Sequence, residues 1–178
     1  MDRRNPYETA FEAYLRSHRL PYLATDETHR TTFDDVPLKS LDFMVMLSQQ
    51  RRLLIDVKGR RFPGGTDKKP RRVWENWSTQ DDITSLIQWA THLGPHAQSL
   101  LVFVYALAPN VVLPSDTPDV WTHHDSRYLL RAVDVESYRR WMRVRSPRWR
   151  TVCLPSDVFR ELVRPFSDFL EPAHFSNG

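Results

Sequence analysis

The segment Leu54-Ile55-Asp56-Val57-Lys58-Gly59 has the pattern of a buried β-strand whose end carries charge. Alternate residues of a strand point to the same face, so Asp56 and Lys58 project together while Ile55 and Val57 project to the other face. An acid and a lysine therefore stand side by side at the end of an otherwise apolar strand. This pairing predicts either a functional site or an ion pair at the edge of a sheet.

A second charged strand precedes it. Residues 40–47 are predicted to form a strand that a polar connection joins to residues 52–58, so the two make a hairpin. Asp42 is a lone charge among the apolar residues of the first strand. Burying an unpaired carboxylate is costly, so charges at such positions predict mutual pairing, a bound cation, or both. The alternative is that Asp42 lies in a solvated hairpin and that the Asp56–Lys58 pair is only an edge ion pair.

Helices and further strands flank this hairpin along the chain. Asn5-Pro6 has the cap and first-turn residues of a helix, and Ser78 and Thr79 precede Asp81 and Asp82 at the spacing of a capping box. The predicted elements are a helix over residues 6–18, strands over 20–24, 40–47 and 52–58, a helix over 79–93, strands over 99–107 and 127–133, and helices over 136–142 and 156–163. This order predicts an α/β fold.

Length and composition limit the protein class. The chain has 178 residues, 40% hydrophobic and 26% charged, which is typical of one folded globular domain. The longest apolar run, residues 100–108, is about half of what a membrane span needs, and the first residues lack a secretory signal, so we expect a cytoplasmic protein with no membrane partner. Cys153 is the only cysteine, which excludes an intramolecular disulfide and a multi-thiolate zinc site. The net charge of +3 permits a polyanionic partner.

Three features together resemble the PD-(D/E)XK nuclease superfamily, which includes restriction enzymes and archaeal-type Holliday-junction resolvases. They are Asp42, the Asp56-x-Lys58 doublet that follows after 13 residues, and an upstream helix that carries a glutamate. The resemblance covers about residues 5–108 and departs from the family at Leu41, where the first motif has a proline. It implies a restriction-endonuclease-like core over residues 1–108, made of a helix, a three-strand meander, a helix and a strand. Residues 109–178 would form a mixed α/β C-terminal extension packed on that core within the same domain.

The resemblance also implies a function: a metal-dependent nuclease that hydrolyses phosphodiester bonds in DNA. Mg²⁺ would be the cofactor, with Mn²⁺ as a substitute. The substrate would be duplex or branched DNA, and a homodimer is one option for assembly. The rival reading is a non-catalytic module of the same fold that binds nucleic acid or protein.

The expected roles follow from metal and phosphate chemistry. Asp42 and Asp56 would be metal ligands together with the carbonyl of Val57, because Mg²⁺ takes oxygen ligands and keeps several waters. Lys58 would stabilise the charge that builds on the phosphate, a safer role than general base for a lysine beside two carboxylates. Glu8 would be an auxiliary acid and metal ligand.

The choice of Glu8 rests on the helical projection. Glu8 lies at the edge of the apolar stripe of the first helix, and Glu12 is expected further round, toward solvent. The alternative for Glu8 is a capping box with Asn5, three residues earlier.

A basic segment follows the lysine directly. Residues 59–72 are predicted to form a loop that overhangs the site and contacts DNA phosphates. The expected nucleic-acid-binding residues are Arg60, Arg61, Lys68, Lys69, Arg71, Arg72, Trp74 and Trp77. The two tryptophans could stack on unpaired bases; the alternative is that at least one of them packs in the core. The alternative for the basic loop is a solvated segment that does not contact DNA.

Three other features carry weaker signals. Residues 139–150 interleave six arginines with Trp141 and Trp149, which indicates either a nucleic-acid surface or arginine stems packed on rings. His123-His124-Asp125 has metal-ligand residue types, but adjacent histidines before a strand are more typical of a turn. Cys153 is expected to be a small buried hydrophobe rather than a nucleophile.

Overall fold

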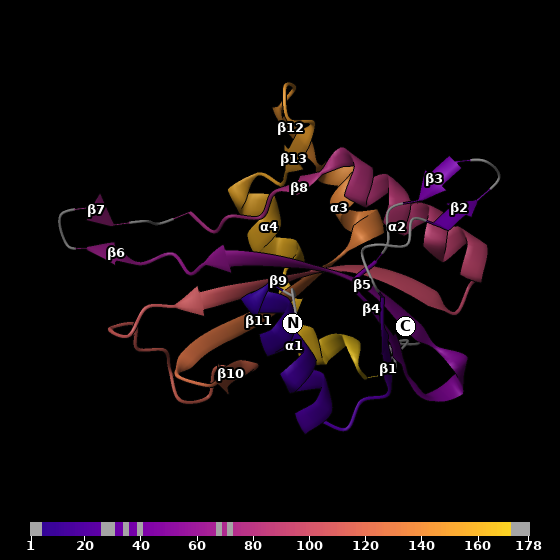
Figure 1. The fold of residues 1–178 in the computed structure, drawn as a ribbon. Coiled ribbons are helices and arrows are strands. Elements are labelled where there is room, and N and C mark those ends of the chain that lie inside the picture. Colours follow the sequence, from indigo (N-terminus) through magenta and orange to yellow (C-terminus); the bar gives the residue numbers. More distant parts are fainter. Residues whose placement is uncertain are drawn as a thin grey trace, which may run out of the picture.

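A mixed seven-stranded sheet forms the centre of the molecule (Figure 1). The computed structural model describes residues 5–25, 31–33, 36–38, 41–66, 69–70 and 73–171. The strand order is β1-β4-β5-β9-β11-β10, and β14 also pairs with β11. These strands are β1 (Tyr22–Ala24), β4 (Phe43–Met46), β5 (Arg52–Arg61), β9 (Ala97–Leu107), β10 (Val120–His123), β11 (Ser126–Asp134) and β14 (Arg164–Pro165). Strands β5 and β9 run parallel, and the other neighbours run antiparallel.

Helices cover both faces of this sheet. Helix α1 lies on one face, and α2, α3 and α4 lie on the other (Figure 1). The helices are α1 (Pro6–Ser17), α2 (Gln80–Leu93), α3 (Val135–Trp141) and α4 (Ser156–Leu162), with the 3₁₀ turns η1 (Ser48–Gln50) and η2 (Phe166–Phe169). Within the described ranges, no helix has the length and apolar character needed to cross a bilayer.

Smaller sheets complete the architecture. One has the order β12-β13-β8, and two are hairpins, β2-β3 and β6-β7. Their strands are β2 (Thr31–Phe33), β3 (Val36–Leu38), β6 (Gly65–Thr66), β7 (Lys69–Pro70), β8 (Ser78–Thr79), β12 (Arg143–Ser146) and β13 (Thr151–Cys153). The β12–β13 hairpin projects from the helical layer that contains α3 (Figure 1).

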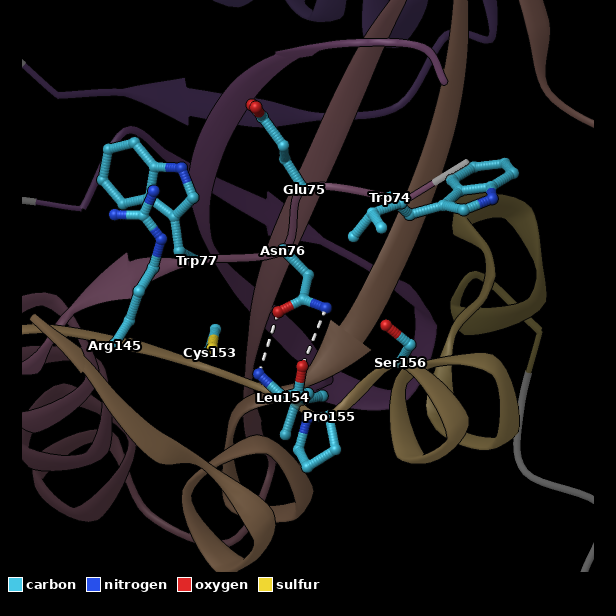
Figure 2. A pocket seen from close by; sticks show the side chains of 10 residues that line it. Trp74, Glu75, Asn76, Trp77, Arg145, Cys153, Leu154, Pro155 and Ser156 are labelled. Carbon is cyan, nitrogen blue, oxygen red and sulfur yellow. Dashed lines mark hydrogen bonds between the residues drawn. The ribbon is translucent and has the colours of Figure 1, made fainter. Parts of the chain in front are cut away.

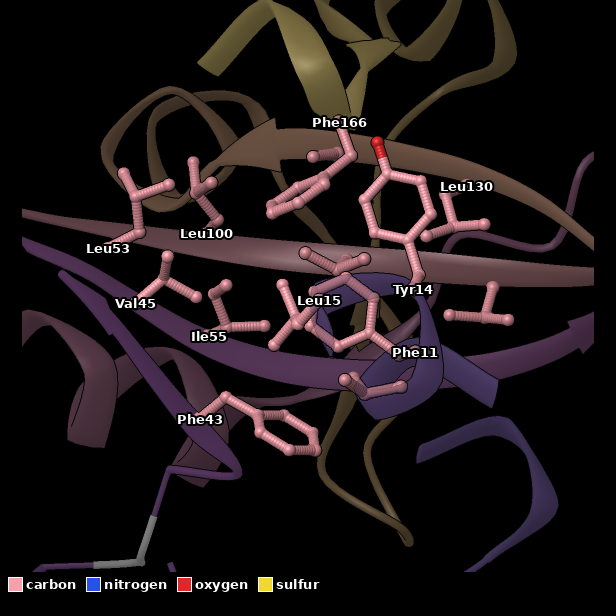
Figure 3. Close-up of a cluster of buried hydrophobic side chains, with 14 of the residues drawn as sticks. Phe11, Tyr14, Leu15, Phe43, Val45, Leu53, Ile55, Leu100, Leu130 and Phe166 are labelled. Atoms are coloured by element: carbon pink, nitrogen blue, oxygen red, sulfur yellow. The ribbon is translucent and has the colours of Figure 1, made fainter. Parts of the chain in front are cut away.

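Alternation along β5 divides the core into two layers. Leu53, Ile55 and Val57 pack in the cluster that includes the apolar side of α1, shown in Figure 3. Leu54 packs in the other cluster, with residues of α2, α3 and α4. Side chains of β5 with even numbers therefore face α2, and this places the charged end of the strand against that helix.

Local signals set the limits of the helices. The Asn5 side chain accepts a hydrogen bond from the Tyr7 N–H (2.8 Å), which caps α1. Thr79 and Asp82 form a reciprocal capping box at the start of α2. Gly94 follows the last turn of α2 with a φ of 90°, a conformation that a glycine adopts without steric cost. The predicted helices over residues 6–18 and 79–93 agree with these limits to within one residue.

Other expectations are wrong. Strand β5 continues to Arg61, so residues 59–61 are strand and not loop, because they pair with Val104, Tyr105 and Ala106 of β9. The strand predicted over residues 40–47 is shorter, and Asp42 lies immediately before β4. Strands β10, β12 and β13 were not expected; their short, mixed sequences lack a period-2 apolar pattern.

Candidate active site

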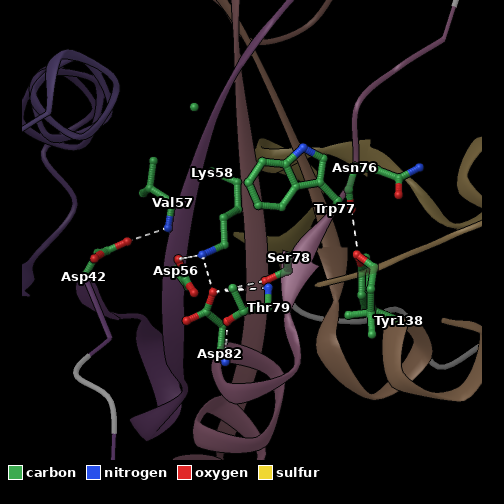
Figure 4. A network of polar contacts seen from close by, with 12 residues as sticks. Asp42, Asp56, Val57, Lys58, Asn76, Trp77, Ser78, Thr79, Asp82 and Tyr138 are labelled. Carbon is green, nitrogen blue, oxygen red and sulfur yellow. Dashed lines mark hydrogen bonds and ion pairs between the residues drawn. The ribbon is translucent and has the colours of Figure 1, made fainter. Parts of the chain in front are cut away.

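Three charged side chains meet where β5 faces the start of α2 (Figure 4). The Lys58 Nζ lies 2.8 Å from Asp56 Oδ1 and 2.8 Å from Asp82 Oδ2. The side chains of Lys58 and Asp56 are each 14% exposed, and that of Asp82 is 1% exposed. The expected Asp56–Lys58 pair therefore exists, and it is enclosed rather than lying at an open sheet edge.

The capping box of α2 holds Asp82 in place. Its Oδ2 accepts hydrogen bonds from the Ser78 hydroxyl (3.3 Å) and the Thr79 N–H (3.4 Å), and its own N–H donates to Thr79 Oγ1 (3.1 Å). Sequence reasoning identified Asp82 as a cap but missed it as a partner of Lys58. A capping box is a local signal, whereas this ion pair depends on how α2 packs across β5.

Lys58 remains charged in this environment. Burial by itself would lower the pKa of the ammonium, but Asp56 and Asp82 raise it by more, and the net pKa lies above the ordinary lysine value. A lysine with a raised pKa is a poor general base near neutral pH. The ammonium can instead act as a fixed positive charge beside Asp56.

Asp42 closes the hydrogen-bond ladder where β4 begins. Its backbone N–H donates to the Ile55 carbonyl (2.9 Å), and its carboxylate Oδ2 accepts from the Val57 N–H (2.6 Å). The side chain thus bonds to the strand residue between Asp56 and Lys58. Asp42 is not in a solvated hairpin.

The pKa of Asp42 is raised to about 8. Burial is the largest cause, the nearby Asp56 carboxylate is the second, and Glu8 also raises it; the Val57 N–H and Lys58 act in the opposite direction. Without a cation, Asp42 is therefore largely protonated at neutral pH. Crowded acids of this kind are a recurring property of functional sites.

The two glutamates of α1 lie in different surroundings. Glu8 is half-buried and close enough to raise the pKa of Asp42. Glu12 is buried: it accepts hydrogen bonds from the Tyr22 hydroxyl (2.7 Å) and from Arg16 (3.0 Å). The expectation that Glu12 faces solvent is wrong, because β1 places Tyr22 over that side of the helix.

Gly59 brings α1 close to the site. A Cβ atom added to Gly59 would lie 2.1 Å from Cδ2 of the Tyr7 ring, a distance that no side chain tolerates. The absence of a side chain lets the Tyr7 ring rest directly on β5, one residue after Lys58. This contact places Glu8, the next residue of α1, near the acids of the site.

The expected nucleic-acid-binding residues are dispersed. Arg60 donates hydrogen bonds to the carbonyls of Gly59 and Trp77, and its guanidinium carbon lies 3.9 Å from the centroid of the Trp77 ring. Burial lowers the pKa of Arg60, although Glu75 opposes the shift. Arg61 is exposed at the end of β5.

Trp74 packs inward and has edge contacts with Phe62 and Tyr105 (centroid distances 5.0 and 4.9 Å). These contacts agree with the alternative that Trp74 packs against the core and does not stack on bases. Lys68, Arg71 and Arg72 lie outside the described residues, as does the side chain of Lys69.

The remaining features behave as ordinary structure. His123 is the last residue of β10, and His124 lies in the β10–β11 turn with a φ of 51°. Cys153 is half-buried and unpaired. Among the residues that the structure describes, no group of three or more His, Cys, Asp or Glu side chains is arranged to hold a metal ion.

The chain resembles known proteins in fold and not in sequence. No protein-family model and no curated protein sequence matches the chain. Among solved structures, it is similar to the Holliday junction resolvase Hjc of the archaeal hyperthermophile Archaeoglobus fulgidus, with a TM-score of 0.55 and 11% sequence identity. The similarity covers 93% of this chain and 98% of that one. The protein therefore shares the overall fold of an archaeal Holliday junction resolvase.

Proposed function

We propose that the protein is a metal-dependent nuclease that hydrolyses phosphodiester bonds in DNA. The observation that carries the proposal is that the Asp42 carboxylate accepts the N–H of Val57, the residue between Asp56 and Lys58, while the Lys58 Nζ lies 2.8 Å from Asp56 Oδ1. The similarity of the fold to a Holliday junction resolvase supports it. The substrate class and the metal are part of the proposal.

The donor chemistry suits a hard divalent cation. Asp42 and Asp56 would hold Mg²⁺ or Mn²⁺, with the Val57 carbonyl and Glu8 as further oxygen donors. Two carboxylates suffice for Mg²⁺ because this ion keeps several of its waters. Burial is the largest cause of the raised pKa of Asp42, and crowding with Asp56, which a cation would relieve, is the second. When bound, the metal supplies an activated water and offsets charge on the phosphate.

Lys58 and Asp82 have different roles in this proposal. Lys58 stabilises negative charge that develops on the scissile phosphate, because its ammonium stays protonated and lies beside Asp56. Asp82 is a positioning residue: it holds the ammonium from the helix side and does not itself contact the substrate.

A non-catalytic binding module is the second candidate. Two observations favour it: the described residues contain no three-membered group of metal-binding side chains, and Lys58 is already neutralised by two carboxylates. Such a module would bind nucleic acid without binding a metal at Asp42 and Asp56.

Calorimetry combined with a cleavage assay distinguishes the two. We expect Mn²⁺ binding that Asp42→Asn or Asp56→Asn abolishes, and metal-dependent cleavage of at least one substrate among duplex, branched and single-stranded DNA and RNA. Arg52→Gln, an exposed change at the opposite end of β5, is the control and should alter neither property. Absence of both metal binding and cleavage would favour the binding module.

A further inference from the structure

Among the described residues, exposed arginines and tryptophans gather on the β12–β13 hairpin, residues 143–153, and on the end of α3 that precedes it. Trp149 in the hairpin turn is 68% exposed, Val144 of β12 is 69% exposed, and Trp141 at the end of α3 is 50% exposed. Exposed apolar side chains that gather in one patch, unlike scattered ones, mark interaction sites. Six arginines lie among them: Arg139, Arg140, Arg143, Arg145, Arg148 and Arg150.

Little acidic charge balances these arginines. In the part of the chain that is described, Glu136 pairs with Arg139 (3.4 Å) and Asp81 pairs with Arg150 (3.0 Å). All four side chains are more than half exposed, and such pairs contribute little and exchange readily. The surface therefore keeps an excess of positive charge, which suits a polyanion.

The two exposed tryptophan rings each have an arginine guanidinium nearby. The guanidinium carbon of Arg148 lies 5.1 Å from the Trp149 ring centroid, and that of Arg140 lies 5.6 Å from the Trp141 centroid. Each ring is thus presented together with a cation. A ligand with both phosphates and free aromatic faces would satisfy both groups.

The hairpin is joined directly to the candidate active site. Strand β13 pairs with β8, and the Gln80 N–H at the start of α2 donates to the Arg150 carbonyl (2.9 Å). Two residues later, Asp82 binds Lys58. The hairpin and the site therefore share a rigid element.

A β-bulge at Arg145 strengthens this connection. The register passes from Val144–Val152 to Ser146–Thr151, so Arg145 is the extra residue of β12. Bulges redirect a side chain, and here the guanidinium carbon lies 5.2 Å from the Trp77 ring centroid. Arg60, two residues beyond Lys58 in β5, contacts the same ring at 3.9 Å.

A pocket of about 550 Å³ opens beside this ring. Its lining includes Trp74, Trp77 and Arg145, and Figure 2 shows the Arg145 side chain reaching the Trp77 indole. Two hydrogen bonds hold the floor of the pocket: the Asn76 Oδ1 accepts from the Leu154 N–H (2.8 Å), and the Asn76 Nδ2 donates to the Leu154 carbonyl (3.2 Å). The pocket is therefore lined from one side by the hairpin residues Arg145 and Cys153 and from the other by residues 73–77, which lead into β8.

We infer that the β12–β13 hairpin binds single-stranded nucleic acid and that the preferred substrate carries an unpaired strand next to the cleavage site. The bases of a duplex are stacked on one another and offer no free face, whereas a single strand offers both phosphates and base faces. An acidic protein would match the positive charge of the arginines but would not offer flat aromatic faces to the exposed tryptophan rings. The substrate assignment rests on the proposed nuclease function; binding of the single strand does not.

The test is fluorescence anisotropy of labelled DNA with Ca²⁺ in place of Mg²⁺, using a single strand, a blunt duplex and a duplex with a single-stranded tail. Trp149→Ala and Trp141→Ala should each weaken single-strand binding about 5- to 100-fold and change blunt-duplex binding much less. Trp149→Phe, which keeps a ring, should restore most of the loss. Val112→Ala, at a side chain 90% exposed, is the control.

Two outcomes overturn the inference. One is unchanged single-strand affinity in the double variant with Trp141 and Trp149 both replaced by alanine. The other is an equal loss for single strand and blunt duplex, which would indicate a general phosphate surface. Melting temperatures within the range of the Val112→Ala control exclude unfolding, because both rings are exposed.

The same set separates this inference from the proposed function. Asp56→Asn should lose cleavage and keep single-strand affinity. If the parent never cleaves but Trp149→Ala weakens single-strand binding, the nuclease proposal fails and the surface stands. If cleavage is metal-dependent and the tryptophan variants bind single-stranded DNA normally, the inference about the hairpin fails and the nuclease proposal stands.

Discussion

Lys58 and Asp82 form a buried ion pair of 2.8 Å between β5 and the first turn of α2. Since Asp56 contacts the same ammonium at 2.8 Å, the lysine is fixed from both its strand and the facing helix. In the proposed nuclease, a positive charge held in this way would need no reorganisation when a phosphate binds.

Replacing Lys58 should distinguish the effect of its positive charge from the effect of its side-chain packing. Lys58→Met keeps most of the stem, so we expect cleavage to fall on the order of 10²- to 10³-fold, the usual effect of removing one group that stabilises transition-state charge. The variant also leaves the Asp82 carboxylate buried without its cation, which should cost about 3 kcal/mol in the free energy of unfolding. Urea unfolding and single-turnover cleavage measure the two effects. Loss of stability with unchanged turnover would make Lys58 purely structural.

Asp82→Asn tests positioning. The amide oxygen can still accept from Ser78 and Thr79, so the cap of α2 should persist, and Lys58 keeps Asp56 as a partner. We expect a reduced kcat with little change in KM, because the ammonium is less firmly held. Asp81→Asn, on the exposed side of the same turn, is the matched control. Equal effects of the two variants would contradict the positioning role.

Metal binding should depend on pH through Asp42. Its raised pKa of about 8 means that a metal must displace a proton below that pH. The affinity for Mn²⁺ should therefore rise about tenfold per pH unit up to pH 8 and level off above it. Calorimetry in buffers of different ionisation enthalpy would detect the released proton. A pH-independent affinity with no proton release would remove Asp42 from the ligand set.

The stability of the metal-free protein should depend on the same group. The pKa of Asp42 rises from 3.8 to about 8 on folding, so between these values the native state binds the proton and the unfolded state does not. The free energy of unfolding of the parent should consequently fall, relative to Asp42→Asn, as the pH rises from 4 to 8. Urea titrations in the presence of a chelator measure the difference. Parallel pH profiles would show that Asp42 ionises normally.

Gly59→Ala should disturb the contact between α1 and β5. The new Cβ would occupy the position of the Tyr7 ring, and such overpacking costs about 1–3 kcal/mol. Gly64→Ala is the control, since the nearest side-chain atom there lies at an ordinary 3.6 Å. Combining Gly59→Ala with Tyr7→Ala should cost less than the sum of the two single changes. Strict additivity, read from denaturant unfolding, would contradict the contact.

Local patterns predicted much of the fold. The cap at Asn5 and the capping box at Thr79 set the starts of α1 and α2, and the apolar alternation of β5 placed Asp56 and Lys58 on one face. Long-range partners were not predictable. Glu12 is buried by Tyr22 of β1, and Lys58 is shared with Asp82, 24 residues away. Strand β13 forms by pairing with β8, which no local pattern encodes.

Cleavage of tailed duplex DNA in Mn²⁺ by the parent and by Asp56→Asn, with Arg52→Gln as the matched control, is the direct test of the proposed metal-dependent nuclease site. We expect the parent and Arg52→Gln to cleave at equal rates, a chelator to stop both, and Asp56→Asn to be slower on the order of 10²-fold or more. Equal cleavage by Asp56→Asn, or cleavage that persists in the chelator, would contradict a metal-dependent nuclease site at Asp42, Asp56 and Lys58.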